Sequence, residues 1–215
     1  MFDVITHSRG GLLARALTEL SDTNISALLG REWNRPVGVQ VNFEKVIFVG
    51  TPNNGTYLAT PTNIPTFIDH AATITSILPD SFGTLALGGL MAVASSVAQV
   101  GIPKLPGLVD QSPDSELLKR LNATKPVTAG SYYAIRADYS GAGKVIGTIS
   151  AEVMNTLFND EANDLVVPTA GVSDNPAFGL LNDRVRTYAN LDAVHHTNYF
   201  FKAETWAQIL NFLGI

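Results

Sequence analysis

The sequence contains no cysteine, and charged residues make up only 15% of it. The first absence excludes disulfide bonds, thiol catalysis and zinc sites built from cysteine, and it leaves the redox compartment open. The net charge is −5, and no long run of lysine or arginine occurs. We therefore expect no nucleic-acid partner, because neutralising phosphates requires clustered cations. The start of the chain shows no basic stretch followed by an apolar one, so no signal peptide is recognised and localisation stays open.

The 215 residues, 46% of them hydrophobic, suffice for one domain with a substantial core. Apolar or alternating runs of strand length predict β-strands at 2–6, 45–50, 131–137 and 184–188. Helical patterns predict helices at 10–22, 114–122, 149–158 and 205–213, the second with Pro113 in its first turn, and a turn at 34–36. Strands that alternate with helices indicate an α/β fold, with a mostly parallel sheet flanked by helices.

Residues 56–128 show an irregular helical pattern between the second and third predicted strands. Within them, residues 81–103 carry no charged side chain, which raises the question of a membrane span. This stretch is rich in glycine, alanine and serine, so its hydrophobicity is moderate, and we predict a buried or cap helix. We expect 56–128 to form a helical cap or lid inserted into a core made of 1–55 and 129–215.

The most informative motif lies near the start of the chain, where Thr6-His7-Ser8-Arg9-Gly10 joins a predicted strand to a predicted helix. This layout is typical of a nucleophile elbow, in which a sharp turn exposes a serine at the edge of a sheet. The residues two before and two after the serine must be small, because backbone segments crowd there. Gly10 and the adjacent Gly11 fit this requirement, and Thr6 departs from the usual glycine. The alternative is a turn serine that caps the helix.

A serine hydroxyl becomes a good nucleophile when a base takes its proton, and that base is usually a histidine held by a carboxylate. In this architecture the chain order is serine, acid, histidine. Asp164 and the adjacent His195 and His196 supply that order. Both histidines follow the last predicted strand, and open α/β sheets keep their sites at the carboxyl ends of strands. We favour His196 as the base, with His195 as the alternative.

We expect the remaining histidines and acids to have structural or surface roles. His7 adjoins the serine, and we expect it to pack or to orient its neighbours. His70 lies in the insertion, and we expect it on the surface or in the cap. The rival acids, which we expect to be solvated loop residues or caps, are Asp160, Asp174, Asp183 and Asp192.

As a set, these motifs resemble the α/β-hydrolase superfamily in its lipase and esterase branch. Residues 7–15 resemble the His-Ser-x-Gly-Gly-Leu-x-x-Arg elbow of bacterial lipases and of deacylases of the glycosylphosphatidylinositol inositol-deacylase type. Residues 46–56 are similar to the strand and Gly-Thr-Pro segment that lead into the lipase cap, and 112–122 resemble the helix that ends it. Residues 164–168 match the family's acid motif, and 196–200 match its histidine motif.

The resemblance implies roles for individual residues. Ser8 would be the nucleophile, Asp164 the acid and His196 the base, and the backbone N–H of Arg9 would form one half of the oxyanion hole. The resemblance implies neither a cofactor nor a metal. In the family, the second oxyanion donor comes from a loop well upstream of the elbow, and early strands precede it. We therefore expect this chain to be the C-terminal portion of an α/β-hydrolase, truncated at its N-terminus.

The function implied by the resemblance is that of a serine hydrolase that cleaves carboxylic esters through an acyl-enzyme on Ser8. Its expected substrates are small-molecule esters or lipid-like acyl esters, and the cap would contact a lipid surface transiently. One alternative is an acyltransferase of the same fold, with an alcohol in place of water as acceptor. Another is a catalytically incomplete fragment that acts as a binding or interaction module. Oligomeric state is left open by all three hypotheses.

Overall fold

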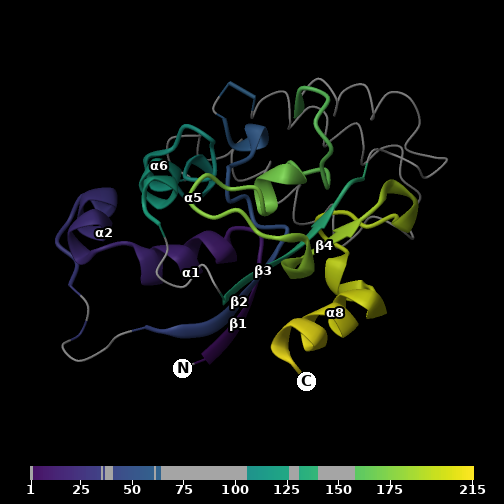
Figure 1. The fold of residues 1–215 in the computed structure, drawn as a ribbon. Coiled ribbons are helices and arrows are strands. Elements are labelled where there is room, and N and C mark those ends of the chain that lie inside the picture. Colours follow the sequence, from purple (N-terminus) through teal and green to yellow (C-terminus); the bar gives the residue numbers. More distant parts are fainter. Residues whose placement is uncertain are drawn as a thin grey trace.

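The core of the chain is a parallel β-sheet (Figure 1). The computed structural model describes residues 2–34, 36, 41–60, 62–63, 106–125, 131–139 and 158–215. Its strands are β1 (Phe2–His7), β2 (Phe43–Val49), β3 (Tyr132–Ala137) and β4 (Val185–Tyr188). They lie side by side in the order β1-β2-β3-β4, and each neighbouring pair is parallel. The predicted α/β class with a parallel sheet flanked by helices is confirmed, as are the strand positions.

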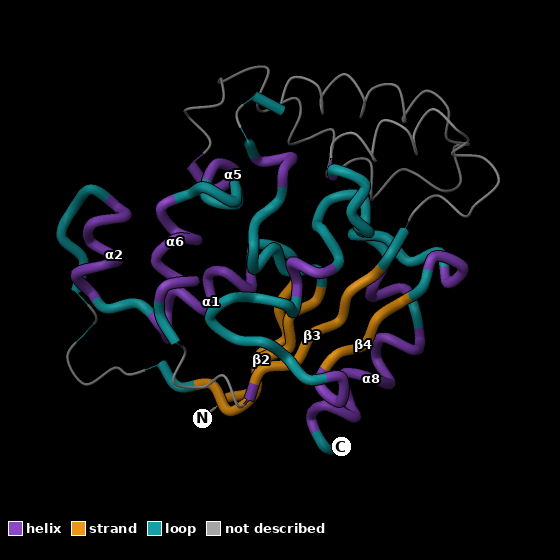
Figure 2. Tube along the Cα trace, turned by 45° about the horizontal axis from the view of Figure 1, so that its top comes forward, coloured by secondary structure: helices purple, strands orange, loops and turns teal. Residues whose placement is uncertain are grey.

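Helices cover both faces of this sheet (Figure 2). The α-helices are α1 (Gly10–Glu19), α2 (Asp22–Leu29), α5 (Pro106–Val109), α6 (Glu116–Ala123) and α8 (Ala203–Leu213). The 3-10 turns are η1 (Tyr57–Ala59), η4 (Ala170–Val172), η5 (Asn182–Arg184), η6 (Asn190–Asp192) and η7 (Tyr199–Phe201). Side chains alternate along β2, so that Val46 and Phe48 pack with α1 while Ile47 and Val49 pack with α8. The core therefore has two layers, one on each side of the sheet.

Helix α1 ends at Glu19 rather than at residue 22, and two further differences, in α2 and α6, are explained by local capping. Helix α2 was not predicted: the Ser21 side chain accepts a hydrogen bond from the Asn24 N–H at its start, and Gly30 ends it in the left-handed region at φ 62°. Helix α6 begins at Glu116 rather than at 114, because Ser115 is its N-cap and accepts from the Leu118 N–H. Pro113 therefore lies outside the helix.

Several predictions fall outside the described residues. These are the charge-free stretch 81–103, His70, and all of the predicted helix 149–158 except Phe158. The insertion over 56–128 and its boundaries stay a prediction. Helices α5 and α6 lie in its C-terminal part, where the chain returns to the sheet. In the parts of the chain that are described, no helix has the length and apolar character needed to cross a membrane.

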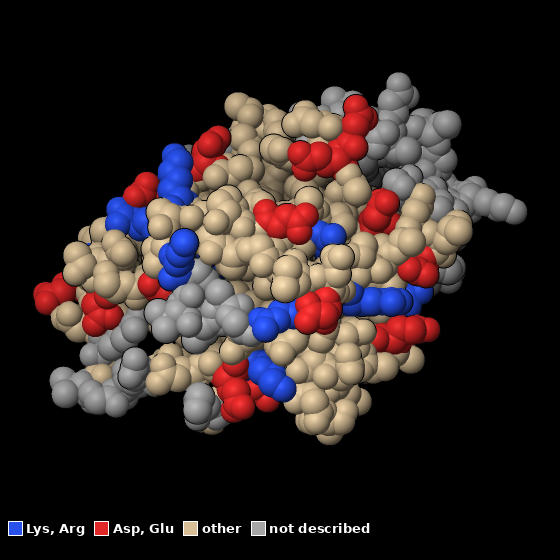
Figure 3. Space-filling view, in the orientation of Figure 1, with Lys and Arg blue, Asp and Glu red and all other residues tan. Residues whose placement is uncertain are grey.

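The β1 side of the sheet exposes apolar side chains. On β1, Phe2 is 75% exposed and Ile5 41%, and on α1 Leu13 and Leu17 are exposed as well. An open apolar edge of this kind is a place where a further strand can pair. Elsewhere on the face drawn in Figure 3, basic and acidic side chains are interspersed.

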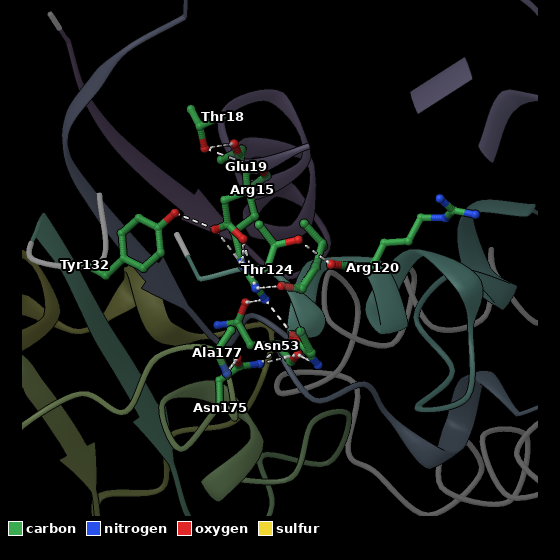
Figure 4. A network of polar contacts seen from close by, with 12 residues as sticks. Arg15, Thr18, Glu19, Asn53, Arg120, Thr124, Tyr132, Asn175 and Ala177 are labelled. Carbon is green, nitrogen blue, oxygen red and sulfur yellow. Dashed lines mark hydrogen bonds and ion pairs between the residues drawn. The ribbon is translucent and has the colours of Figure 1, made fainter. Parts of the chain in front are cut away.

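A buried polar network fixes α1 to the rest of the fold (Figure 4). At its centre Arg15 pairs with Glu19 at 3.0 Å, and the two side chains are 0% and 1% exposed. The Arg15 guanidinium also donates to Asn53 Oδ1 and Asn122 Oδ1 and to the Leu121 carbonyl. A buried ion pair is stable only when its remaining hydrogen-bonding groups are satisfied, and here three other segments of the chain, the turn after β2, the end of α6 and β3, supply the partners.

The same network reaches β3 and the segment after η4. The Tyr132 hydroxyl donates to Glu19 at 2.6 Å, and the Arg15 guanidinium lies 4.8 Å from the centre of the Phe178 ring. The Asn175 amide donates to the Asn53 carbonyl and to Asn122 Oδ1. The turn after β2, the end of α6 and the loop after η4 are thus held to α1 by one set of hydrogen bonds.

We predict that Arg15→Met destabilises the fold by about 3–5 kcal/mol, because it leaves the Glu19 carboxylate buried without its partner. Urea unfolding measures the change. The double variant Arg15→Met/Glu19→Met should recover part of the loss, since it removes the orphaned charge.

The matched control is Glu116→Gln, which breaks the exposed Glu116–Arg120 pair of α6. It should cost less than about 1 kcal/mol. Equal losses at Glu116 and Arg15 would contradict the importance assigned to the buried pair.

Candidate active site

Ser8 occupies a sharp turn between β1 and α1. Its φ is 54°, in the left-handed region that residues other than glycine rarely adopt, and its N–H donates to the Val49 carbonyl at the end of β2. A conformation of this kind costs on the order of 1–3 kcal/mol and persists only where surrounding structure holds it. The half-buried Ser8 side chain is thereby placed at the carboxyl end of the sheet. This is the geometry of a nucleophile elbow.

The closest packing at the elbow lies at Gly11, three residues after Ser8, rather than at Gly10, two residues after it. A Cβ added at Gly10 would meet only the Thr6 Cβ, at an ordinary 3.9 Å. A Cβ added at Gly11 would lie 2.3 Å from Thr51 Oγ1 and 2.9 Å from the Phe48 ring. Glycine is therefore required at Gly11 rather than at Gly10. Thr6 is accommodated because its hydroxyl donates to the Ile47 carbonyl.

Asp164 and His196 form a buried pair beside the elbow. His196 Nδ1 lies 2.9 Å from Asp164 Oδ2, and the two residues are 6% and 1% exposed. The His196 N–H also donates to the Asp164 carbonyl. Because an ionised carboxylate only accepts, Nδ1 carries the proton, and the neutral ring then presents a lone pair on Nε2. An imidazole in this state can accept a proton from a hydroxyl.

Hydrogen bonds converge on the Asp164 carboxylate from several directions. Oδ1 accepts the N–H groups of Val166 and Val167, and Oδ2 accepts the Tyr199 hydroxyl as well as His196. Burial alone would raise the pKa of this carboxyl, but the adjacent His196 ring and these hydrogen bonds outweigh it, so the pKa lies below its usual value. Burial and the neighbouring carboxylate raise the pKa of Tyr199 well above its usual value, which keeps its hydroxyl as a donor.

The other candidate acids lie in exposed positions. Asp174 pairs with Arg136 at 3.2 Å, and Asp192 accepts the Ala189 N–H. In the described part of the chain, neither these two nor Asp160 and Asp183 bonds to a histidine. His195 lies apart from the pair, with Nδ1 at 3.0 Å from the Thr197 hydroxyl and its ring against Tyr139. Burial lowers the pKa of His195.

The structure brings the elbow and the acid–histidine pair together through His7, the neighbour of Ser8. His7 Nε2 lies 2.7 Å from the His196 carbonyl, and the two ring centroids are 4.8 Å apart. No hydrogen bond joins the Ser8 hydroxyl to a described residue. Hydrogen bonds between catalytic groups are often long in unliganded sites and tighten when substrate binds.

Arg9 places its backbone N–H at the N-terminal end of α1. Among the described residues this N–H has no hydrogen-bond acceptor, and the positive end of a helix favours negative charge. The Arg9 side chain extends to α5, where a Cβ added at Gly107 would overlap its guanidinium. The elbow thus contacts the returning end of the predicted insertion. No group of three or more metal-ligating side chains occurs within the described ranges.

Tyr199 and Gly50 belong to the site but were not singled out in the sequence. At φ 54°, Gly50 ends β2, and a Cβ there would lie 3.0–3.2 Å from Tyr199, Asp164 and His196. Only a residue without a side chain lets this cluster approach the sheet. A tyrosine three residues after His196 and a glycine at the end of an apolar strand were the available signals.

Residues 1–214 match the model of a family described as "Domain of unknown function (DUF7379)". The chain belongs to the DUF7379 family. No curated protein matches this DUF7379 sequence.

Solved structures show a fold similar to that of the DUF7379 chain. EstA from Clostridium botulinum superposes with a TM-score of 0.54 at 18% identity, over 98% of this chain and 64% of EstA. The lipase of Staphylococcus hyicus gives 0.48 at 15% identity, over 99% and 68%. Lipase 1 from Pelosinus fermentans gives 0.49 at 15%, over 91% and 65%. The chain therefore spans about two thirds of the length of these proteins, and its α/β fold, with a parallel sheet flanked by helices, is similar to that of EstA.

We predict effects of different size for alanine at the two elbow glycines. Gly11→Ala should destabilise the fold by about 1–3 kcal/mol, because the new methyl group overlaps Thr51 and Phe48. Gly10→Ala adds a methyl group at ordinary contact distance in the first turn of α1, so stability should stay within about 1 kcal/mol of the parent. Thermal unfolding of both variants checks the prediction, and a larger loss at Gly10 than at Gly11 would contradict it.

We also predict that Asp164→Asn destabilises the protein at pH 7 by about 1–3 kcal/mol, because the amide presents N–H groups to the donors that face Oδ2. The folded pKa of Asp164 is lowered, so its ionisation stabilises the fold fully above the unfolded value of about 3.9. That contribution is lost as the pH falls through the folded pKa. Urea unfolding should therefore show the gap between the parent and Asp164→Asn narrowing below about pH 4.

The control for this titration is Asp174→Asn, which alters an exposed carboxylate. Its effect at pH 7 should stay below about 1 kcal/mol. A gap for Asp164→Asn that stays constant from pH 7 down to the acid transition would refute the assignment of an ionised Asp164.

Proposed function

We propose that this protein is a serine hydrolase that cleaves carboxylic esters through an acyl-enzyme on Ser8. The observation that carries the proposal is the buried Asp164–His196 pair, held beside a left-handed serine on a strand-to-helix turn. Desolvating a carboxylate and a histidine together is costly, so such a pair at the carboxyl end of a parallel sheet points to catalysis. The α/β-hydrolase fold agrees with this chemistry but does not by itself assign it.

The proposed reaction has two steps. The Ser8 oxygen attacks the carbonyl carbon of the ester while its proton passes to Nε2 of His196, and the resulting imidazolium is stabilised by the Asp164 carboxylate. The tetrahedral intermediate expels the alcohol, which takes the proton from His196, and an acyl-enzyme remains. A water molecule then attacks the acyl carbon with His196 again as base, which releases the carboxylic acid and restores Ser8.

The Arg9 N–H is the proposed donor to the oxyanion formed in both steps. It lies directly after the nucleophile and has no acceptor among the described residues. An oxyanion donor contributes about 10²–10³ in rate, so a second donor would add a comparable factor. Lipid-like acyl esters are the proposed substrates, because the charge-free residues 81–103 fall within the predicted cap.

We predict that a fluorophosphonate probe labels the parent protein at Ser8 and that Ser8→Ala abolishes labelling. The probe's phosphorus accepts the serine oxygen and loses fluoride, so labelling reports an activated serine without requiring the natural substrate. Intact mass and peptide mapping identify the site. Hydrolysis of acyl esters of increasing chain length should fall by about 10⁴-fold or more in Ser8→Ala.

The matched control is Ser21→Ala, which removes the same hydroxyl from the exposed N-cap of α2. It should cost about 1 kcal/mol of stability and leave labelling unchanged. A folded parent protein that is neither labelled nor active on any ester would refute the proposal and favour a binding or interaction module.

A further inference from the structure

His7 links the two halves of the candidate site. It is the last residue of β1 and directly precedes Ser8, yet its ring lies against the loop that carries His196, 189 positions away in sequence. Besides His196, the Phe200 ring stands edge-on at 5.7 Å and the Tyr199 ring at 6.3 Å. Three rings of this loop therefore surround the side chain next to the nucleophile.

The hydrogen bond from His7 to the His196 carbonyl shows which ring nitrogen of His7 carries a proton. A carbonyl oxygen only accepts, so the 2.7 Å contact with the His196 carbonyl requires a proton on His7 Nε2. Burial and the neighbouring His196 lower the pKa of His7, which favours the neutral ring. The titratable groups that face this ring in the described structure are His196, Asp164 and Tyr199.

Three hydrogen bonds then define where His196 lies. Asp164 holds its backbone N–H and its Nδ1, and His7 holds its carbonyl. The Asp164 contacts fix the ring relative to the acid loop. Of these three hydrogen bonds, the one from His7, the residue beside Ser8, joins His196 to the elbow.

We propose that His7 is a positioning residue, which as a neutral ring holds the His196 base in register with Ser8. This inference rests on the proposed ester hydrolysis for its kinetic consequences but not for its structural ones. A protonated His7 would place a positive charge 4.8 Å from the imidazolium that forms when His196 accepts the serine proton. Both rings must therefore be neutral in the reactive form.

Two variants separate the hydrogen bond from the ring contact. His7→Phe keeps an aromatic ring but has no donor, and kcat should fall about 10–100-fold with little change in KM, because the base is misplaced. His7→Gln offers an amide N–H to the same carbonyl and should retain kcat to within about fivefold. The matched control pair, His195→Phe and His195→Gln, changes the adjacent histidine and should leave kcat within about twofold in both.

The pH profile supplies a readout that a purely structural role would not move. In the parent protein, log kcat/KM should fall with a limiting slope of two at acid pH, because protonation of either His7 or His196 removes the reactive form. In His7→Gln the limiting slope should be one. A slope of two in His7→Gln, or full kcat in His7→Phe, would overturn the proposal.

Nuclear magnetic resonance of ring-labelled histidine tests the link without activity. The parent protein should show His7 as the Nε2–H tautomer and a His196 Nδ1–H signal protected from exchange. His7→Gln should keep the His196 signal, and His7→Phe should lose its protection. Unchanged His196 signals in His7→Phe would overturn the positioning role even if the parent hydrolyses esters. A different outcome is that His7→Phe loses the protection of the His196 signal while the parent protein neither reacts with the fluorophosphonate probe nor hydrolyses esters. That result would refute the proposed function but would support the structural link between His7 and His196.

Discussion

The buried ion pair of Arg15 and Glu19 is the constraint on which the rest of the fold depends. Two desolvated charges inside a domain are tolerable only when their hydrogen-bonding capacity is filled, and the hydrogen-bonding partners come from the turn after β2, the end of α6 and β3, while the Phe178 ring after η4 packs against the guanidinium. The hydrogen bonds that Arg15 and Glu19 require therefore bring together segments that are far apart in sequence. Helix α1 becomes a rigid support, and its first residues form the elbow.

That rigidity explains how Ser8 keeps its left-handed backbone. The strain of one such residue is small beside the loss expected from breaking a buried ion pair, about 1–3 against 3–5 kcal/mol. At the other side of the turn, Gly11 lets α1 approach Thr51, which ties the elbow to the end of β2. The acid loop is fixed independently, through the hydrogen bonds that converge on Asp164. The elbow on α1 and the acid loop, each held by its own hydrogen bonds, therefore meet at the carboxyl end of the sheet.

Much of this arrangement follows from local sequence, and the remainder depends on contacts across the fold. The strands are continuous apolar or alternating runs, so the class of fold could be predicted, and the order Ser8, Asp164, His196 is visible in the chain, so candidate residues could be named. The roles of Tyr199 and Gly50, and the tighter crowding at Gly11 than at Gly10, could not be predicted, because they arise only when distant backbones approach each other. Helix α2 was missed for a different reason, since its signal lies in the two caps, Ser21 and Gly30, rather than in an apolar stripe.

The contrast between the two polar clusters is the strongest argument for chemistry at the second. Buried polar groups in proteins are nearly always paired, and the groups around Arg15 follow that rule. Beside the elbow, the Ser8 hydroxyl, Nε2 of His196 and the Arg9 N–H make no hydrogen bond to any described residue. A nucleophile, a base and an oxyanion donor are the three groups that must stay available for a substrate in acyl transfer. A structural cluster would gain by pairing such groups, so leaving them unpaired beside a rigid support agrees with the proposed ester hydrolysis.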